Sequence, residues 1–265
     1  MIDFGKIFRT AFMYPLRKDV FLLLFGVQLA FVLLFSYANE HVNVLVTWTK
    51  TMPLALLLSI LLLLVVYSLV VLFLMAMYFD NAARFYKGKR KHILESIGVA
   101  KKRFIPLMLV NVVVWLVIIA CVFVGVVPLT LVISLGMLQN AIFAIILFFI
   151  GIVVGAITIF SMSLAPASCV IDSLGVFDSI KRSWKIVMEK NKLNTLVFFL
   201  VVFLVVLVVG GVPTKVLELI FMDAPVFSVQ GIASLFIGQI INVYLLLFLY
   251  SSIVNYYLGV RKIKA

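Results

Sequence analysis

Uninterrupted apolar runs alternate along this chain with shorter segments that carry nearly all of its charge. A helix needs about 20 apolar residues to cross a bilayer. Six runs approach or exceed that length, at residues 20–38, 53–79, 106–131, 138–165, 195–212 and 231–258. Strands of a membrane barrel would instead show alternating hydrophobicity over about ten residues. The pattern therefore predicts an all-α fold, a polytopic membrane bundle of six transmembrane helices.

The composition excludes other classes of protein. Residues of the set AVILMFWYC make up 66% of the chain and charged residues 12%, whereas soluble domains average about 45–50% apolar and about 25% charged residues. A globular core cannot bury this much apolar surface, so a soluble protein is excluded. Intrinsic disorder, which requires low hydrophobicity and high charge, is excluded as well.

The basic residues fall on one side of the predicted spans. All of the 22 Lys and Arg residues except Lys50 and Lys215 precede the first span, separate spans two and three or four and five, or follow the sixth. Cytoplasmic loops carry such an excess of Lys and Arg. We therefore predict a multi-pass protein of the cell membrane with both termini in the cytoplasm. The net charge of +12 then belongs to the membrane surface, and no nucleic-acid partner is expected.

Three of the basic segments have the spacing of amphipathic helices with a basic polar face. Their apolar faces consist of Phe4, Ile7, Phe8, Ala11 and Phe12, of Ile93, Ile97, Ala100 and Phe104, and of Phe177, Ile180, Trp184 and Val187. Two spans follow each segment. We therefore predict one integral membrane domain, residues 1–265, built from three helix-plus-hairpin units at residues 1–80, 81–165 and 166–265.

The second and third amphipathic segments supply candidate binding residues. These are Lys89, Arg90, Lys91, Lys101, Lys102, Arg103, Lys181, Arg182, Trp184 and Lys185. Each Lys or Arg near an anionic membrane surface contributes about 1 kcal/mol of attraction. Membrane lipids with anionic head groups are thus the expected partners at the cytoplasmic face. Docking of a cytoplasmic protein on the same face is the alternative, and the sequence leaves both open.

The third segment has the most specific local sequence. It contains Ala165-Pro166-Ala167, then Asp172 and Gly175, and then Ser183-Trp184. This arrangement resembles a motif that precedes the fifth span in a group of uncharacterised prokaryotic, in part archaeal, six-span membrane proteins. The opening Phe8-x-x-Ala11-Phe12-x-Tyr14-Pro15, followed by Lys18-Asp19, is similar to the start of such proteins.

That group includes the membrane domain fused to some glycerophosphodiester phosphodiesterases. The resemblance implies a six-span layout and carries no catalytic residue to this chain, because the phosphodiesterase chemistry belongs to a separate soluble domain.

Polar side chains are scarce inside the predicted spans, and none of them is Asp, Glu, Lys or Arg. Ionisable groups in the membrane are the usual mark of proton relays, so a proton-coupled transporter is not expected. Gln28, Asn111, Gln239 and Asn242 are candidates for a small intramembrane polar spot. Ordinary interhelical hydrogen bonds explain these residues equally well.

Candidate chemistry is otherwise lacking. His41 and His92 fall on opposite predicted sides of the membrane, so they cannot share a metal ion, and no Cys/His spacing suggests zinc. The sequence contains no HExxH, GxSxG or Walker motif. We therefore expect no catalytic site, no metal and no cofactor.

Two further features concern packing. Gly151 and Gly155 form a GxxxG pattern in the fourth span, which predicts close helix packing inside the bundle rather than dimerisation. Residues 215–222 predict a short helix at the outer surface, between spans five and six.

The sequence as a whole favours a non-enzymatic integral membrane protein that organises lipid or scaffolds a membrane complex through its basic cytoplasmic helices. The alternative is the permease half of an ATP-driven (type-two ABC) exporter, which has a similar length, six spans and cytoplasmic termini. An intramembrane enzyme that acts on lipid is a more distant alternative.

Overall fold

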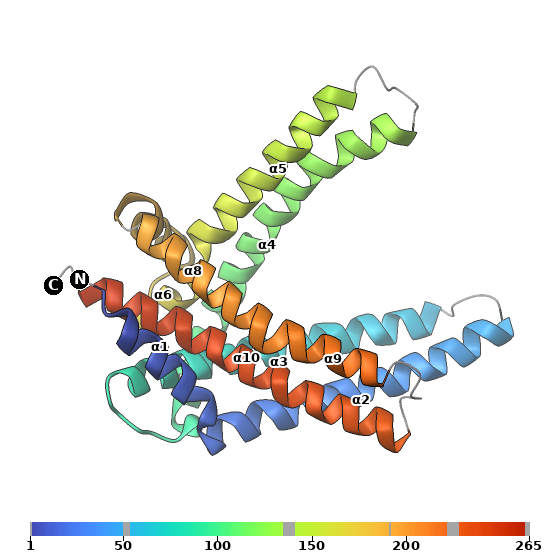
Figure 1. Ribbon diagram of the computed structural model, residues 1–265, viewed down its shortest axis with the longest axis horizontal. Coiled ribbons are helices and arrows are strands. Elements are labelled where there is room, and N and C mark those ends of the chain that lie inside the picture. Colours follow the sequence, from blue (N-terminus) through green and yellow to red (C-terminus); the bar gives the residue numbers. More distant parts are fainter. Residues whose placement is uncertain (1, 50–53, 135–140, 191, 222–227, 263–265) are drawn as a thin grey trace. The chain divides into compact units, whose positions relative to one another are not determined.

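The computed structural model describes residues 2–49, 54–134, 141–190, 192–221 and 228–262, and every regular element in these ranges is helical (Figure 1). Six helical stretches are long and apolar enough to cross a membrane, which confirms the predicted all-α membrane bundle. They are carried by α2 (Lys18–Thr49), α3 (Leu54–Tyr86), α4 (Ile97–Ser134), α5 (Ala141–Met162), α8 (Lys192–Val206) and α10 (Val229–Lys262). The predicted starts of the second and fourth spans, at residues 53 and 138–140, lie outside the described residues.

The chain folds into two compact units. The first unit combines Met1–Lys101 with Leu196–Ala265, and the second unit is Lys102–Thr195. Both boundaries between the units therefore fall inside helices, one near the start of α4 and the other near the start of α8. The threefold division at residues 1–80, 81–165 and 166–265 concerns repetition in the sequence and stays a prediction.

In the first unit, α10 packs against α2, α3 and the short helix α1 (Phe4–Met13). Asp3 caps α1, because its side chain accepts a hydrogen bond from the Lys6 amide at 2.9 Å. The apolar face predicted for this segment contacts the rest of the unit: Phe8 stacks on Phe198 of α8, and Phe12, which is 37% exposed, lies 4.6 Å from Phe248 of α10, between ring centroids. The first amphipathic helix thus docks on the bundle, and the start of α1 lies beside the last turns of α10 (Figure 1).

The second amphipathic segment does not form a separate interfacial helix. The short 3-10 helix η2 (Ile93–Ser96), which has a His92–Glu95 capping box, leads directly into α4. That helix continues through Pro106 into the third span. Proline at 106 removes one backbone hydrogen bond to the carbonyl of residue 102. Lys102 is exposed there, so water can replace the missing donor and the helix need not end.

The predicted outer helix is likewise continuous with a span. A π-helical turn, η5 (Leu207–Gly211), joins α8 directly to α9 (Val212–Ile220). Because no break separates them, the outer segment extends the fifth span through residue 220.

In the second unit, the motif from Ala165 to Trp184 shapes the connection after α5. It forms α6 (Ala165–Ile171) and α7 (Val176–Trp184), which is followed by a π-helical turn, η4 (Lys185–Lys190). The Ser183 hydroxyl donates to the Ser161 carbonyl at 2.6 Å and accepts from the Leu164 amide at 3.1 Å. Asp172 forms an ion pair with Arg182 at 3.2 Å. The motif residues thus hold α6 and α7 against the end of α5.

The face that α7 buries is polar. Ser179 and Ser183 are fully buried, whereas Phe177 is 79% and Trp184 43% exposed. The apolar face identified from the sequence is therefore divided, because Phe177 and Trp184 are exposed whereas Val187, in η4, is fully buried. The two exposed aromatic side chains are suited to contact lipid rather than the protein core.

A left-handed glycine ends α3. Gly88 has a φ of +78°, and the Lys89 and Gly88 amides donate to the Arg84 and Phe85 carbonyls at 2.9 Å each. This is a Schellman ending, in which a residue with a Cβ is strained. It turns the chain back along the end of the bundle.

We expect Gly88→Ala to lower the free energy of unfolding by about 1–2 kcal/mol, the cost of a Cβ in the left-handed region. Gly98→Ala is the matched control, because Gly98 is helical and a Cβ there meets nothing within 4 Å. The control should be neutral or stabilising. Unfolding followed by circular dichroism in mild detergent measures both, and equal effects would contradict the strained turn.

Candidate functional site

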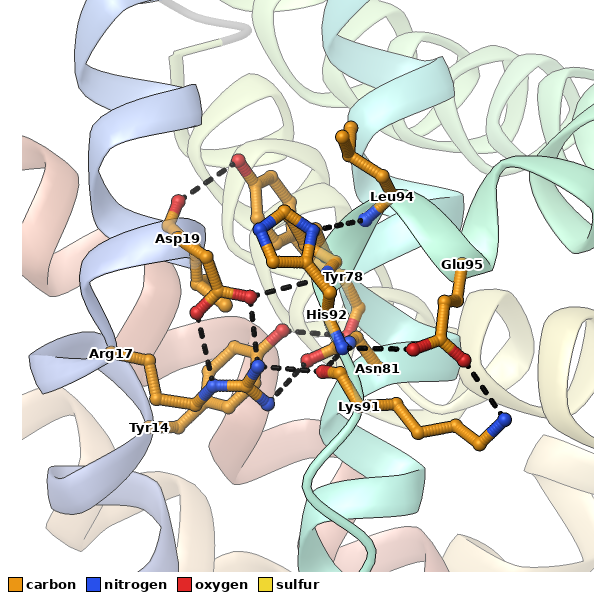
Figure 2. A network of polar contacts seen from close by, with 11 residues as sticks. Tyr14, Arg17, Asp19, Tyr78, Asn81, Lys91, His92, Leu94 and Glu95 are labelled. Atoms are coloured by element: carbon orange, nitrogen blue, oxygen red, sulfur yellow. Dashed lines mark hydrogen bonds and ion pairs between the residues drawn. The ribbon is translucent and has the colours of Figure 1, made fainter.

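A network of polar contacts centred on Arg17 joins three parts of the first unit (Figure 2). The Arg17 Nε and Nη2 atoms donate to the two carboxylate oxygens of Asp19 at 3.2 and 2.8 Å. Its Nη1 atom donates to Oδ1 of Asn81 at 3.0 Å, and Nη2 also donates to the Lys91 carbonyl at 2.6 Å. One guanidinium therefore ties the start of α2 to the end of α3 and to the basic segment after it.

Neighbouring groups complete this network. Asp19 also accepts from the Ile93 amide at 3.0 Å, and Asn81 donates to the Lys91 carbonyl at 3.1 Å. At the neighbouring position of α3, a carboxylate oxygen of Asp80 accepts from Arg84 and from Ser96, each at 2.8 Å. The segment from Gly88 to Ser96 is thus held against the ends of two spans by side chains rather than by helix contacts alone.

Two buried tyrosines lie next to the network (Figure 2). The Tyr14 hydroxyl donates to the Tyr78 carbonyl, and the Tyr78 hydroxyl donates to the Val20 carbonyl, both at 3.3 Å. Burial raises the pKa of the Tyr14 hydroxyl well above its usual value. It therefore remains a neutral hydrogen-bond donor at any physiological pH.

A groove of about 750 Å³ opens beside Arg17, and we call it the basic groove. Its charged lining consists of Arg9, Arg17, Lys18 and Arg90 with the single carboxylate of Asp19. Arg17 and Asp19 neutralise each other at 2.8 Å. Arg9, Lys18 and Arg90 are exposed and form no ion pair or hydrogen bond through their side chains with any residue that the structure describes. The basic groove therefore has an excess of positive charge suited to anionic groups such as phosphates.

Local structure explains how these cations come to line one groove. Pro15 lies in the 3-10 turn η1 (Tyr14–Leu16), which separates α1 from α2, so that Arg9 of α1 and Lys18 of α2 both line the basic groove. On the other side, the left-handed Gly88 and the hydrogen bonds to the Lys91 carbonyl fix the position of Arg90.

The basic residues identified from the sequence are divided between the two units. In the first unit, Arg90 lines the basic groove, and Lys91 pairs with Glu95 at 2.8 Å. Lys89 and Lys101 are exposed there. In the second unit, Arg182 pairs with Asp172. Lys102, Lys181, Trp184 and Lys185 are exposed in that unit, and Arg103 is half-buried.

Sequence reasoning missed several residues of the site: Arg9, Arg17, Lys18, Asp19 and Asn81. A signal was present, since Asp19 and Asn81 stand at the very ends of apolar runs where charge and amide groups are scarce. No local pattern could pair Arg17 with Asn81, because 64 residues separate them.

The four residues of the predicted intramembrane polar spot are divided between the two units. Gln28, Gln239 and Asn242 belong to the first unit and Asn111 to the second. The side-chain oxygens of Gln28 and Gln239 are buried without a hydrogen-bond partner among the described residues. Asn111 donates to the Leu107 carbonyl of its own helix at 2.8 Å, and Asn242 is exposed. The polar spot stays a prediction.

Within the described ranges, no group of three His, Cys, Asp or Glu side chains is arranged to hold a metal ion. Two residues used in the sequence analysis, Lys50 and the side chain of His41, lie outside the described residues.

Comparison with known proteins gives a family. No curated protein and no solved structure matches the chain. The model of a domain of unknown function, DUF7847, matches residues 2–259 and so includes both compact units and the basic groove. The chain therefore belongs to the DUF7847 family of domains of unknown function.

Proposed function

We propose that this protein is a non-enzymatic membrane protein of the cell membrane that gathers anionic lipids around its basic, cytoplasmic end. The observation that carries the proposal is the exposure of Arg9, Lys18 and Arg90 without partners among the described residues. They stand beside the ends of membrane-spanning helices. Each such charge near an anionic surface contributes about 1 kcal/mol of attraction.

The proposed orientation has both termini in the cytoplasm. It is supported by the excess of Lys and Arg on one side of the spans. The docking of α1 on α10 near the C-terminus adds support, because the Asn255 amide donates to the Ile7 carbonyl at 3.3 Å. The two ends of the chain and the basic groove then share one side of the membrane.

Lipid is favoured over a cytoplasmic protein by the surroundings of the basic groove. Leu16 is 66% and Leu22 63% exposed next to these cations. Leu22 belongs to the first candidate membrane span, Lys18–Ala38, where lipid rather than a water-soluble partner covers an exposed side chain. We also propose that the chain is related to the prokaryotic six-span group that it resembles from Ala165 to Trp184, which includes the membrane domain fused to some glycerophosphodiester phosphodiesterases.

The test measures which lipids surround the protein. After reconstitution in bilayer nanodiscs of phosphatidylcholine and phosphatidylglycerol, we expect phosphatidylglycerol to be enriched near the protein in 0.1 M salt. Enrichment should fall sharply in 1 M salt, since the screening length falls from about 10 to about 3 Å. Spin-labelled lipids of both kinds report the enrichment.

Equal amounts of both lipids near the protein at low salt would overturn the proposal. Purification from native membranes with a stoichiometric cytoplasmic protein would favour the scaffold alternative, and an ATPase in that position would favour the exporter alternative.

A further inference from the structure

A second groove adjoins the basic groove along α2 and α10, and we call it the apolar groove. It has a volume of about 640 Å³. Phe21 and Leu22 of α2 face Ile240 and Ile241 of α10 across it. Leu16 and Lys18 line both grooves, so the two adjoin at these residues.

The chemistry of the lining changes from one groove to the other. The basic groove contains the charged groups of Arg9, Lys18 and Arg90, whereas the apolar groove is lined, apart from Lys18, by aliphatic and aromatic groups. The one hydroxyl in that lining, on Tyr244, is engaged with the Phe12 carbonyl at 3.3 Å. A ligand that fills both grooves must therefore be anionic at one end and a long hydrocarbon at the other.

We propose that the two grooves together bind one anionic phospholipid, with the phosphate in the basic groove and an acyl chain in the apolar groove. This inference rests on the proposed function and adds a single, stoichiometric site to it. Arg9 and Arg90 offer planar guanidinium groups that can pair with phosphate oxygens through two hydrogen bonds. Lys18 stands at the junction, where its aliphatic stem contacts the chain and its ammonium reaches the phosphate.

Other occupants satisfy only part of this surface. A free phosphate would leave the apolar groove empty, and an acidic peptide has no chain comparable to an acyl group. The volumes of both grooves fall within the range of about 300–1,000 Å³ that is usual for small-ligand sites. Arg17 forms a fixed wall of the site, because Asp19 and Asn81 already hold its guanidinium.

The first part of the test concerns the charged head group. It uses native mass spectrometry in mild detergent, with phosphatidylglycerol or phosphatidylcholine that carry identical acyl chains. We expect one phosphatidylglycerol to be retained by each wild-type chain. The double variant Arg9→Gln/Arg90→Gln should bind it about 30-fold more weakly. The matched control is Lys87→Gln/Lys89→Gln, which removes the same charge from exposed residues of the same segment that do not line the groove.

The second part of the test concerns the acyl chain and blocks the apolar groove with a larger side chain. Leu22→Trp should weaken retention of phosphatidylglycerol about tenfold, whereas Leu34→Trp, at another exposed position of α2, should not. Millimolar glycerol phosphate should not displace the lipid, because it lacks the chain. Displacement by glycerol phosphate would assign the basic groove to a soluble phosphate compound and overturn the proposal.

The outcomes separate this inference from the proposed function. If the control variants lose as much lipid as the groove variants, or if no lipid is retained in a one-to-one ratio, the site is overturned. The salt-dependent enrichment of phosphatidylglycerol in nanodiscs would then still stand by itself. If that enrichment is missing as well, both proposals fail. Circular dichroism of each variant establishes that it is folded before it is compared.

Discussion

Replacing Arg17 with glutamine is expected to lower the free energy of unfolding by about 2–4 kcal/mol. The Arg17 and Asp19 side chains are each only 17% exposed, and their closest atoms are 2.8 Å apart. Removing the guanidinium leaves a largely buried carboxylate without its counter-charge, and it removes the donors to Asn81 and to the Lys91 carbonyl. The loss of a partner from such a pair costs more than the pair itself contributes. Titration with a denaturing detergent, followed by circular dichroism, measures the change.

An exposed ion pair of the same region serves as the control. Lys91 and Glu95 are also 2.8 Å apart, but their side chains are 47% and 46% exposed. Lys91→Gln removes this pair and leaves the main-chain carbonyl in place, so the change should stay below about 0.5 kcal/mol. The double variant Arg17→Gln/Asp19→Asn should recover part of the loss, because no unpaired carboxylate remains. Equal effects of Arg17→Gln and Lys91→Gln would show that the network does not stabilise the fold.

The number and position of the spans could be predicted from the sequence for a simple physical reason. A bilayer imposes a length of about 20 apolar residues on every crossing, and local hydrophobicity alone reports it. The connections between spans were less accessible. Whether a helix ends at Pro106 depends on what replaces one missing hydrogen bond, and the sequence does not record that. The structure continues the helix from Ile97 to Ser134.

The face of a helix that is buried was also ambiguous in this composition. In a soluble protein, Phe177 and Trp184 would mark the core side of α7. Here lipid is as apolar as a protein core, so the buried contact goes to Ser179 and Ser183, whose hydroxyl groups donate to the Gly175 and Ser161 carbonyls. Polar rather than apolar periodicity therefore indicates the inner face of this helix.

The candidate site was predictable in kind but not in detail. The excess of positive charge on one side was evident, and it includes Arg90. Which cations remain available depends on which are neutralised: Asp19 neutralises Arg17, and Asp172 pairs with Arg182. The sequence does not record either pairing, nor the hydrogen bond from Arg17 to Asn81, 64 positions away. Lys18, at the first residue of α2, was noted only as part of a motif, although it lines both grooves.

Gly151→Leu is expected to lower the free energy of unfolding by about 3 kcal/mol, at the upper end of the range for overpacking. In the second unit, a Cβ at Gly151 would lie 2.8 Å from the Cα of Gly125 and 2.9 Å from the Cys121 carbonyl oxygen. Both are backbone atoms of α4, so no side-chain rotation can relieve the clash and the two helices must separate. Gly155→Ala is the matched control, because its Cβ meets only the Cβ of Cys121, at an ordinary 3.5 Å.

The same crossing offers a direct measure of helix separation. A cysteine introduced at Gly155 would place its Cβ 3.5 Å from that of Cys121, within the range of about 3.5–4.5 Å found in disulfides. We expect Gly155→Cys to form this bond with Cys121 under mild oxidation. Neither of the two cysteines should then react with a maleimide label. Val154→Cys, at an exposed neighbouring position, should not form it. If the bond is lost when Gly151→Leu is added, the lost stability comes from separation of α4 and α5. An unchanged bond would show that the helices stay together and would contradict this account.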